Sequence, residues 1–195
     1  MDRNGDAVDQ QIAGHLDAAR AGDSDAFTAI YHALAGKVAG FVRGRGVRDV
    51  DDVVNEVFLG VFRNFDTFEG DASAFRSWLF TIARYKATDA IRAAVRTPTA
   101  GAAELPDASG GDVEVDAMAH LGDETVAMLD LLTDEQREVV LLRIIADLSL
   151  AQVAEITDRP LGAVKSIQHR ALASLRRQLR PPVSDLADRT IADET

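Results

Sequence analysis

Apolar residues recur along most of this chain at the spacing of an amphipathic α-helix, and they do not alternate as they would in a β-strand. The clearest case is residues 50–65, where apolar positions three and four residues apart form one stripe after a suitable N-cap residue, Asp49. The same periodicity predicts helices over residues 10–21 and 25–44, and another that starts near Ala74. The stripe of the clearest helix consists of Val50, Val53, Val54, Val57, Phe58, Val61, Phe62 and Phe65.

Two capping boxes mark helix starts in the C-terminal part of the chain. Thr133 stands three residues before Gln136, and Ser149 stands three residues before Gln152. In this pattern the side chain of each residue bonds the backbone N–H of the other, so that two unpaired donors at the helix start are satisfied. The first box opens a helix that is apolar on nearly all sides over residues 139–145, which places this helix at the centre of a small domain.

The segment after the second box has the pattern of a helix-turn-helix motif. A short helix over residues 150–156 stops before Pro160, and a longer basic helix begins at Leu161. At 100° per residue, this longer helix has one leucine-rich side and an opposite side of small, hydrogen-bonding and cationic residues, as a reader of the major groove requires. The side predicted to pack consists of Leu161, Val164, Leu172, Leu175 and Leu179.

Charge is spread unevenly over the 195 residues, whose formal net charge is −11. Residues 97–132 carry eight acidic and no basic residues, whereas residues 161–180 carry five basic and no acidic ones. The acidic total therefore does not exclude nucleic acid as a ligand, because binding depends on the charge of each surface patch. The absence of cysteine excludes disulfides, thiolate metal sites and thiol chemistry. The four histidines show no ligand spacing, so we expect no metal site.

Composition divides the chain into two small all-α domains. Small residues, two prolines and acidic charge predict a flexible linker over residues 97–119, between domains at 1–96 and 120–180. Residues 181–195 are predicted to be a disordered acidic tail. The chain has no apolar run of about 18 residues and no signal-peptide pattern at its start, so we expect a cytoplasmic protein without membrane insertion.

Two sets of motifs, one in each predicted domain, resemble a known family. In their order and spacing they are similar to bacterial RNA polymerase sigma factors of the extracytoplasmic-function (ECF) class. The first set comprises residues 22–27 (GDSDAF), 51–59 (DDVVNEVFL), Phe68, 75–79 (FRSWL) and 82–84 (IAR). The second set comprises Leu132, 136–137 (QR), 142–143 (LR), 148–149 (LS), 153–154 (VA), Pro160, 162–166 (GAVKS) and 170–171 (RA).

This resemblance implies a transcription initiation factor with two partners, core RNA polymerase and promoter DNA. The first domain would dock on polymerase through the side of the 50–65 helix that faces away from the core, and it would open the minus-ten element. The second domain would read the minus-thirty-five element. The expected polymerase contacts are Asp52, Asn55, Glu56, Leu59 and Arg63. The expected minus-thirty-five contacts are Arg159, Ala163, Lys165, Ser166, His169, Arg170 and Arg177.

Melting a promoter requires a site for an unpaired base, and such bases are held by aromatic or planar groups beside cations. Residues 66–74 and the helix after them supply groups of this kind. Phe75 and Trp78 lie on the apolar stripe and are expected in the core, whereas Phe80 falls on the polar face. The expected minus-ten contacts are Phe68, Arg76, Phe80, Arg84, Tyr85 and Lys86.

The resemblance implies no catalytic residue and no cofactor, because the polymerase supplies the chemistry. An anti-sigma factor is a common further partner in this class, although nothing in the sequence identifies one. Two alternatives stay open at this point. A stand-alone helix-turn-helix regulator with an N-terminal sensor domain would bind duplex DNA by itself, and a helical adaptor would not bind DNA at all.

Overall fold

The structure is a computed structural model that describes residues 3–96 and 123–178. These two ranges are helical and contain no strand, which confirms the all-α prediction. The first range forms α1 (Arg3–Arg20), α2 (Ser24–Gly44), α3 (Val50–Arg63), the 3-10 turn η1 (Phe65–Thr67) and α4 (Ala72–Arg96). The second range forms α5 (Asp123–Leu129), α6 (Asp134–Ile144), α7 (Leu150–Thr157) and α8 (Leu161–Gln178). The predicted linker and tail lie outside the described residues.

Local capping explains where several helices begin. The side chain of Asp23 accepts hydrogen bonds from the N–H groups of Asp25 and Ala26, at 2.8 and 3.1 Å. Both predicted capping boxes are present, one at the start of α6 and one at the start of α7. Asp49 occupies the N-cap position of α3 as predicted, but its side chain makes no capping hydrogen bond.

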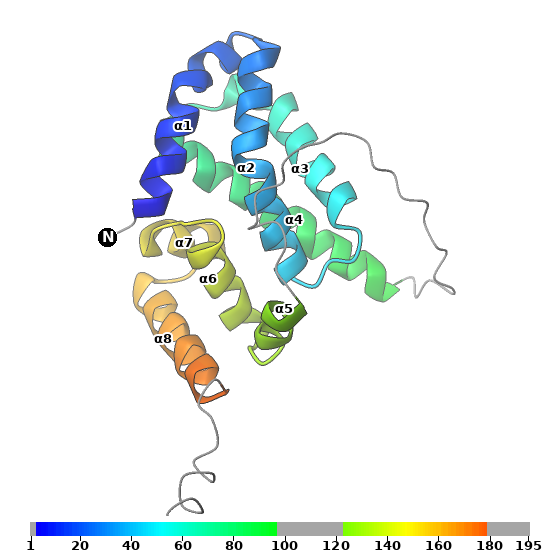
Figure 1. The fold of residues 1–195 in the computed structure, drawn as a ribbon, viewed down its shortest axis with the longest axis vertical. Coiled ribbons are helices and arrows are strands. Elements are labelled where there is room, and N and C mark those ends of the chain that lie inside the picture. The colour runs from blue at the N-terminus through cyan, green and yellow to red at the C-terminus, as the bar shows by residue number, and fades with distance from the viewer. Residues whose placement is uncertain (1–2, 97–122, 179–195) are drawn as a thin grey trace, which may run out of the picture.

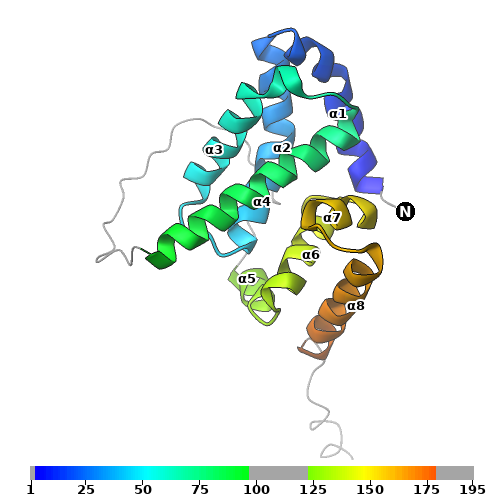
Figure 2. The same ribbon diagram turned by 180° about the vertical axis from the view of Figure 1, so that it is seen from behind.

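α1, α2, α3 and α4 form one bundle, in which α2 packs against the other three helices (Figures 1 and 2). Ile30, Leu34, Val38 and Phe41 follow one stripe of α2 and are fully buried. Aromatic residues fill the end of the bundle near η1. There Phe65 and Phe75 are buried with ring centroids 5.3 Å apart, which confirms the core position predicted for Phe75.

α6 lies at the centre of the second group of helices, as predicted, and α8 packs against both α6 and α7. The buried residues of α8 are Val164, Ile167 and Ala171. The prediction that Leu161 belongs to the packed side is wrong, because Leu161 is 42% exposed. It is the first residue of α8, and helical side chains tilt toward the N-terminus, so its side chain extends past the packed turns.

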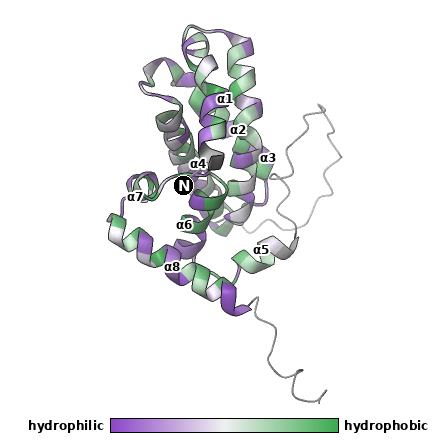
Figure 3. Ribbon diagram, turned by 60° about the vertical axis from the view of Figure 1, so that its left-hand side comes forward, coloured by the Kyte–Doolittle hydropathy of each residue, from purple (hydrophilic) through white to green (hydrophobic). Residues whose placement is uncertain are grey.

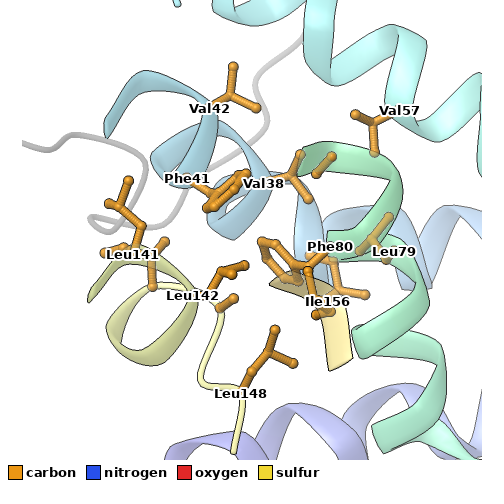
Figure 4. Packing of buried hydrophobic residues seen from close by; sticks show 14 of the residues in the cluster. Val38, Phe41, Val42, Val57, Leu79, Phe80, Leu141, Leu142, Leu148 and Ile156 are labelled. Carbon is orange, nitrogen blue, oxygen red and sulfur yellow. The ribbon is translucent and has the colours of Figure 1, made fainter. Parts of the chain in front are cut away.

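The two groups of helices share one continuous hydrophobic core. α6 packs against α2, and α7 packs against α4, so the second group closes over one side of the bundle (Figures 1 and 2). Figure 4 shows the junction, where Phe41 and Phe80 of the bundle lie beside Leu142 and Leu148 of the second group. The helices described from 3–96 and 123–178 include none that is both long and apolar enough to cross a membrane.

Candidate nucleic-acid interface

The turn between α7 and α8 sets the direction of the candidate recognition helix. α7 ends at Thr157, whose hydroxyl donates to the carbonyl of Val153 at 2.6 Å. Asp158 then adopts a left-handed conformation with φ 52°, which Asp tolerates better than most residues. The N–H of Arg159 donates back to the carbonyl of Ala154 at 2.9 Å, which closes the end of α7 before α8 begins.

Most of the residues expected to read the minus-thirty-five element share one exposed face of α8. Hydrophilic and hydrophobic residues alternate along this helix, as expected for an amphipathic helix (Figure 3). Arg159 and Ala163 are half-buried, and Arg159 bonds Glu135 at 2.8 Å. The exposed members of the set are Lys165, Ser166, His169, Arg170 and Arg177.

The Lys and Arg residues of α8 have no carboxylate partner among the described residues, and Lys165 and Arg170 are among those in this exposed set. The Nε of Arg170 donates to the carbonyl of Ser166 at 3.4 Å, which leaves the two Nη groups for a ligand. A guanidinium on an exposed helix face suits the paired acceptors of guanine, and an ammonium suits a phosphate. The face can therefore hold both kinds of DNA contact.

A second exposed face lies on α3. All five residues expected to contact polymerase are exposed: Asp52, Asn55, Glu56, Leu59 and Arg63. The side chain of Leu59 is 51% exposed among these charges, a pattern typical of the centre of a protein interface.

Phe62 extends this face, although the sequence placed it on the core stripe. It is 62% exposed, and its ring meets the edge of Phe27 at a centroid distance of 5.2 Å. The core prediction for Phe62 is therefore wrong. Each four-residue step along a helix turns the stripe by about 40°, so Phe62, at the far end of α3, has rotated out of the bundle.

The six residues expected at the minus-ten element do not share one surface. Tyr85 is 60% exposed, and the guanidinium carbon of Arg84 lies 5.8 Å from the centre of its ring. Lys86 bonds Glu56 of α3 at 2.9 Å, which brings an expected DNA contact next to an expected polymerase contact. Phe68 is 8% exposed, and its ring stacks on Trp78 at a centroid distance of 5.1 Å.

Arg76 and Phe80 lie inside the molecule, at 3% and 0% exposure. The prediction that Phe80 lies on an exposed polar face is therefore wrong. Arg76 bonds Asp9 of α1 at 3.0 Å and donates to the carbonyl of Asp147 at 3.0 Å. Burial raises the pKa of Asp9, and the guanidinium of Arg76 opposes that shift. In this arrangement neither Arg76 nor Phe80 can reach DNA.

Sequence reasoning missed four residues that join the two groups of helices: Lys37, Arg45, Glu138 and Asp147. A usable signal was present for two of them. Lys37 falls within the apolar stripe of α2, and Glu138 directly precedes the apolar run of α6. A charged residue in a buried stripe requires a partner from another element. The described ranges hold no cluster of three or more residues suited to binding a metal.

Comparison with known proteins identifies the family to which this chain belongs. The family described as Sigma-70 region 2 matches residues 29–97, and Sigma-70, region 4 matches residues 128–177. The chain is 30% identical over 188 residues to the ECF RNA polymerase sigma factor SigD of Mycobacterium tuberculosis, covering 92% of this chain and 87% of that protein. It is 30% identical over 190 residues to SigW of Bacillus subtilis, covering 89% and 99% respectively.

Solved structures agree with this class. The structure of CnrH in complex with the cytosolic domain of CnrY is similar with a TM-score of 0.61 and 25% identity, over 88% of this chain and 97% of that chain. The sigma factor RpoE from Bartonella quintana, solved with the anti-sigma factor NepR, shares the fold with a TM-score of 0.59 and 22% identity, over 78% and 96%.

The chain belongs to the ECF RNA polymerase sigma factors, and it directs promoter-specific transcription. The region 2 match covers most of the N-terminal bundle, so the alternatives of a sensor domain and of a helical adaptor are set aside.

Proposed function

We propose that three parts of the chain divide the steps of initiation among them. The exposed face of α3 docks on core polymerase, the exposed face of α8 reads the minus-thirty-five element, and α4 with the preceding loop opens the minus-ten element. The observation that carries this proposal is the face of α8. There Lys165, Ser166, His169 and Arg170 are exposed opposite a buried apolar side, behind a capped helix-turn-helix.

At the minus-ten element, Tyr85 and Lys86 are the members of the expected set that are best placed for an unpaired base. An exposed aromatic ring beside a cation is the arrangement that holds such bases, and the guanidinium carbon of Arg84 lies 5.8 Å from the centre of the Tyr85 ring. Phe68, Arg76, Phe80 and Arg84 are engaged within the protein: Phe68 stacks on Trp78, Arg76 and Phe80 are buried, and Arg84 bonds Glu138.

The factor supplies no catalytic group and uses no cofactor, and it acts in the cytoplasm, where polymerase and chromosome meet. We also propose an anti-sigma partner. The sigma factor RpoE from Bartonella quintana, which shares this fold, was solved in complex with the anti-sigma factor NepR, which supports a comparable partner for this chain.

Run-off transcription tests the assignment directly. Core polymerase is incubated with a library of random upstream sequences, with and without this protein, and the start sites are sequenced. We expect a set of starts that depend on the protein and share two upstream motifs. Arg170→Ala should change the minus-thirty-five motif, whereas Tyr85→Ala should lower initiation and leave the minus-thirty-five motif intact. No protein-dependent starts, with core polymerase active on a control sigma factor, would contradict the proposal.

A further inference from the structure

An apolar groove is formed by α5, α6 and the last turns of α8, the three helices that Figures 1 and 2 show in the second group. Its volume is about 200 Å³, and seven of the eight residues that line it are apolar. An apolar cavity of about 150 Å³ holds a molecule the size of benzene, so this groove has room for an aliphatic side chain. The buried residues at its floor are Leu129, Val140, Leu141 and Ile145.

The rim of this groove reaches the surface. Ile144, the last residue of α6, is 52% exposed, and Met128 and Leu175 are half-buried. An exposed apolar rim around an apolar groove is typical of a surface that binds a partner. Grooves of this kind accept the apolar side of an amphipathic helix, whose anchoring side chains recur at spacings of three and four residues.

The sequence that follows α8 contains such a set of anchors, within residues 183–193, which we name the C-terminal segment. Pro181 and Pro182 stand directly before it, and proline both ends a preceding helix and suits the first turn of a new one. Five positions of the segment share one helical stripe at i, i+3, i+4, i+7 and i+8, and four of them are apolar. This stripe consists of Val183, Leu186, Ala187, Thr190 and Ile191.

The C-terminal segment begins close to the groove. Leu175 lines the groove and lies three residues before Gln178, the last residue of α8. Three residues of helix span about 4.5 Å, and residues 179–182 can span at most about 14 Å. The start of the segment therefore lies within about 20 Å of Leu175 along the chain, close enough to turn back onto the groove.

This short connection makes docking within one molecule favourable. A short flexible connection gives an effective concentration of about 1 mM. A segment that bound as a separate peptide with a Kd of about 0.1 mM would therefore be docked in roughly nine of ten molecules. A second copy or another protein would need a far higher affinity to occupy the groove at micromolar concentration.

Charge also favours the chain's own segment as the occupant. The last turn of α8 carries Arg176 and Arg177, which have no carboxylate partner among the described residues. Residues 181–195 carry four acidic residues and one basic residue, and Asp185 and Asp188 fall on the polar side of the segment. A segment that turns back past the end of α8 brings these carboxylates near the two cations, which lowers the free energy of docking.

We propose that the C-terminal segment docks as a helix in the groove between α5, α6 and α8, with Leu186 and Ile191 as its main anchors. The composition of residues 181–195 predicts disorder because the segment alone cannot bury its apolar side, and the groove supplies the missing surface. The chain thus occupies this groove itself, and any other ligand must first displace the segment. The inference is independent of the proposed function, since it involves neither polymerase nor DNA.

Trypsin cleavage after Arg189 tests this docking in the full chain. Arg189 is the only Lys or Arg within residues 181–195, and the bond after Arg180 resists trypsin because proline follows it. Cleavage at a site that opens transiently follows the population of the open state. The initial rate at which residues 190–195 are released is measured by mass spectrometry. The rate from a synthetic peptide of residues 179–195 gives the unprotected reference.

The groove variant is Ile144→Ser, which changes the rim of the groove and leaves the sequence around Arg189 intact. The matched control is Leu131→Ser, since Leu131 is 49% exposed and lies outside the groove. We expect the unmodified chain and Leu131→Ser to release the fragment about tenfold more slowly than the peptide, as the docked fraction above implies. We expect Ile144→Ser to release it at least about threefold faster than the unmodified chain.

An unmodified chain that is cleaved as fast as the peptide would overturn the docking. So would an unchanged rate in Ile144→Ser with native helicity by circular dichroism. If Ile144→Ser unfolds, Leu186→Ser is compared with Ala192→Ser on the polar side of the segment, each against its own peptide, and equal protection overturns the docking.

Protein concentration separates the chain's own segment from that of a second copy. We expect the protection of Arg189 to stay constant on hundredfold dilution, because docking within one molecule does not depend on concentration. Protection that disappears on dilution would assign the groove to the segment of a second copy and overturn the proposal as stated.

Discussion

Replacing Gly44 by alanine tests whether the two groups of helices pack as described. A Cβ atom at Gly44, the last residue of α2, would lie 2.5 Å from Cδ2 of Leu141 and 3.3 Å from Cδ1 of Leu129. Carbon atoms pack best at about 3.5–4.0 Å, so Leu141 must move by about 1 Å or more. Leu141 is only 1% exposed, and overpacking at such sites costs about 1–3 kcal/mol.

The matched control is Gly14→Ala in α1, where a Cβ atom meets nothing within 4 Å. Glycine to alanine inside a helix stabilises by about 0.8–1.0 kcal/mol, so Gly14→Ala should raise the free energy of unfolding by that amount. The free energy of unfolding of Gly44→Ala should lie about 1–3 kcal/mol below that of Gly14→Ala. This difference cannot exceed the free energy that couples the two groups of helices. Urea unfolding followed by circular dichroism measures both variants. If Gly44→Ala is stabilised as much as Gly14→Ala, Leu141 does not pack on Gly44 in solution.

Three further outcomes are expected. Leu59→Asp should lower the affinity for core polymerase at least about tenfold and change the free energy of unfolding by less than about 0.5 kcal/mol. In the same binding assay the control Ala13→Asp should leave the affinity unchanged. Burial raises the pKa of Asp9 above its ordinary 3.8, so as pH rises the Asp9 carboxyl ionises first in the unfolded chain. The stability that the protonated Asp9 contributes is therefore lost as pH rises from 3.8 through the raised pKa of the folded state. Urea titrations at several pH values should show that Asp9→Asn lacks this loss. Thr133→Ala should cost about 1 kcal/mol in thermal unfolding, and Ser149→Ala should cost more, because its capping box also carries the contact to Ser73; equal losses would contradict that coupling.

Features encoded by residues close in sequence were predicted well. The capping boxes at Thr133 and Ser149 depend on residues three positions apart, and both are present. The helix-turn-helix followed from the same boxes and from Pro160, and the exposed face of α8 followed from helical periodicity.

Features that depend on distant residues were not predicted. Phe80 and Arg76 occupy polar-looking positions on α4, and the contacts that bury them come from distant elements. Arg76 bonds Asp9 of α1 and the carbonyl of Asp147, which lies 71 residues further along the chain, and the ring of Phe80 lies 5.7 Å from that of Phe41 in α2. Periodicity within one helix cannot show which of its faces meets a segment so far along the chain. Glu138 and Lys37 did indicate contacts between distant elements, since a charged residue in an apolar stripe requires a partner from another element.

The exposed face of α8 leads to a prediction that separates two kinds of DNA contact. Arg170 can present both Nη groups to guanine, and a bidentate contact is worth about 1–3 kcal/mol of discrimination against the wrong base. Lys165 is better suited to a phosphate, which positions the helix without reading sequence. With holoenzyme, Arg170→Ala should relax preference at one minus-thirty-five base pair, whereas Lys165→Ala should weaken all promoters alike and reduce the salt dependence by about one phosphate contact. Both variants are measured over single-base promoter changes and several salt concentrations. A uniform loss over all promoters in Arg170→Ala would show that Arg170 contacts a phosphate instead of a base.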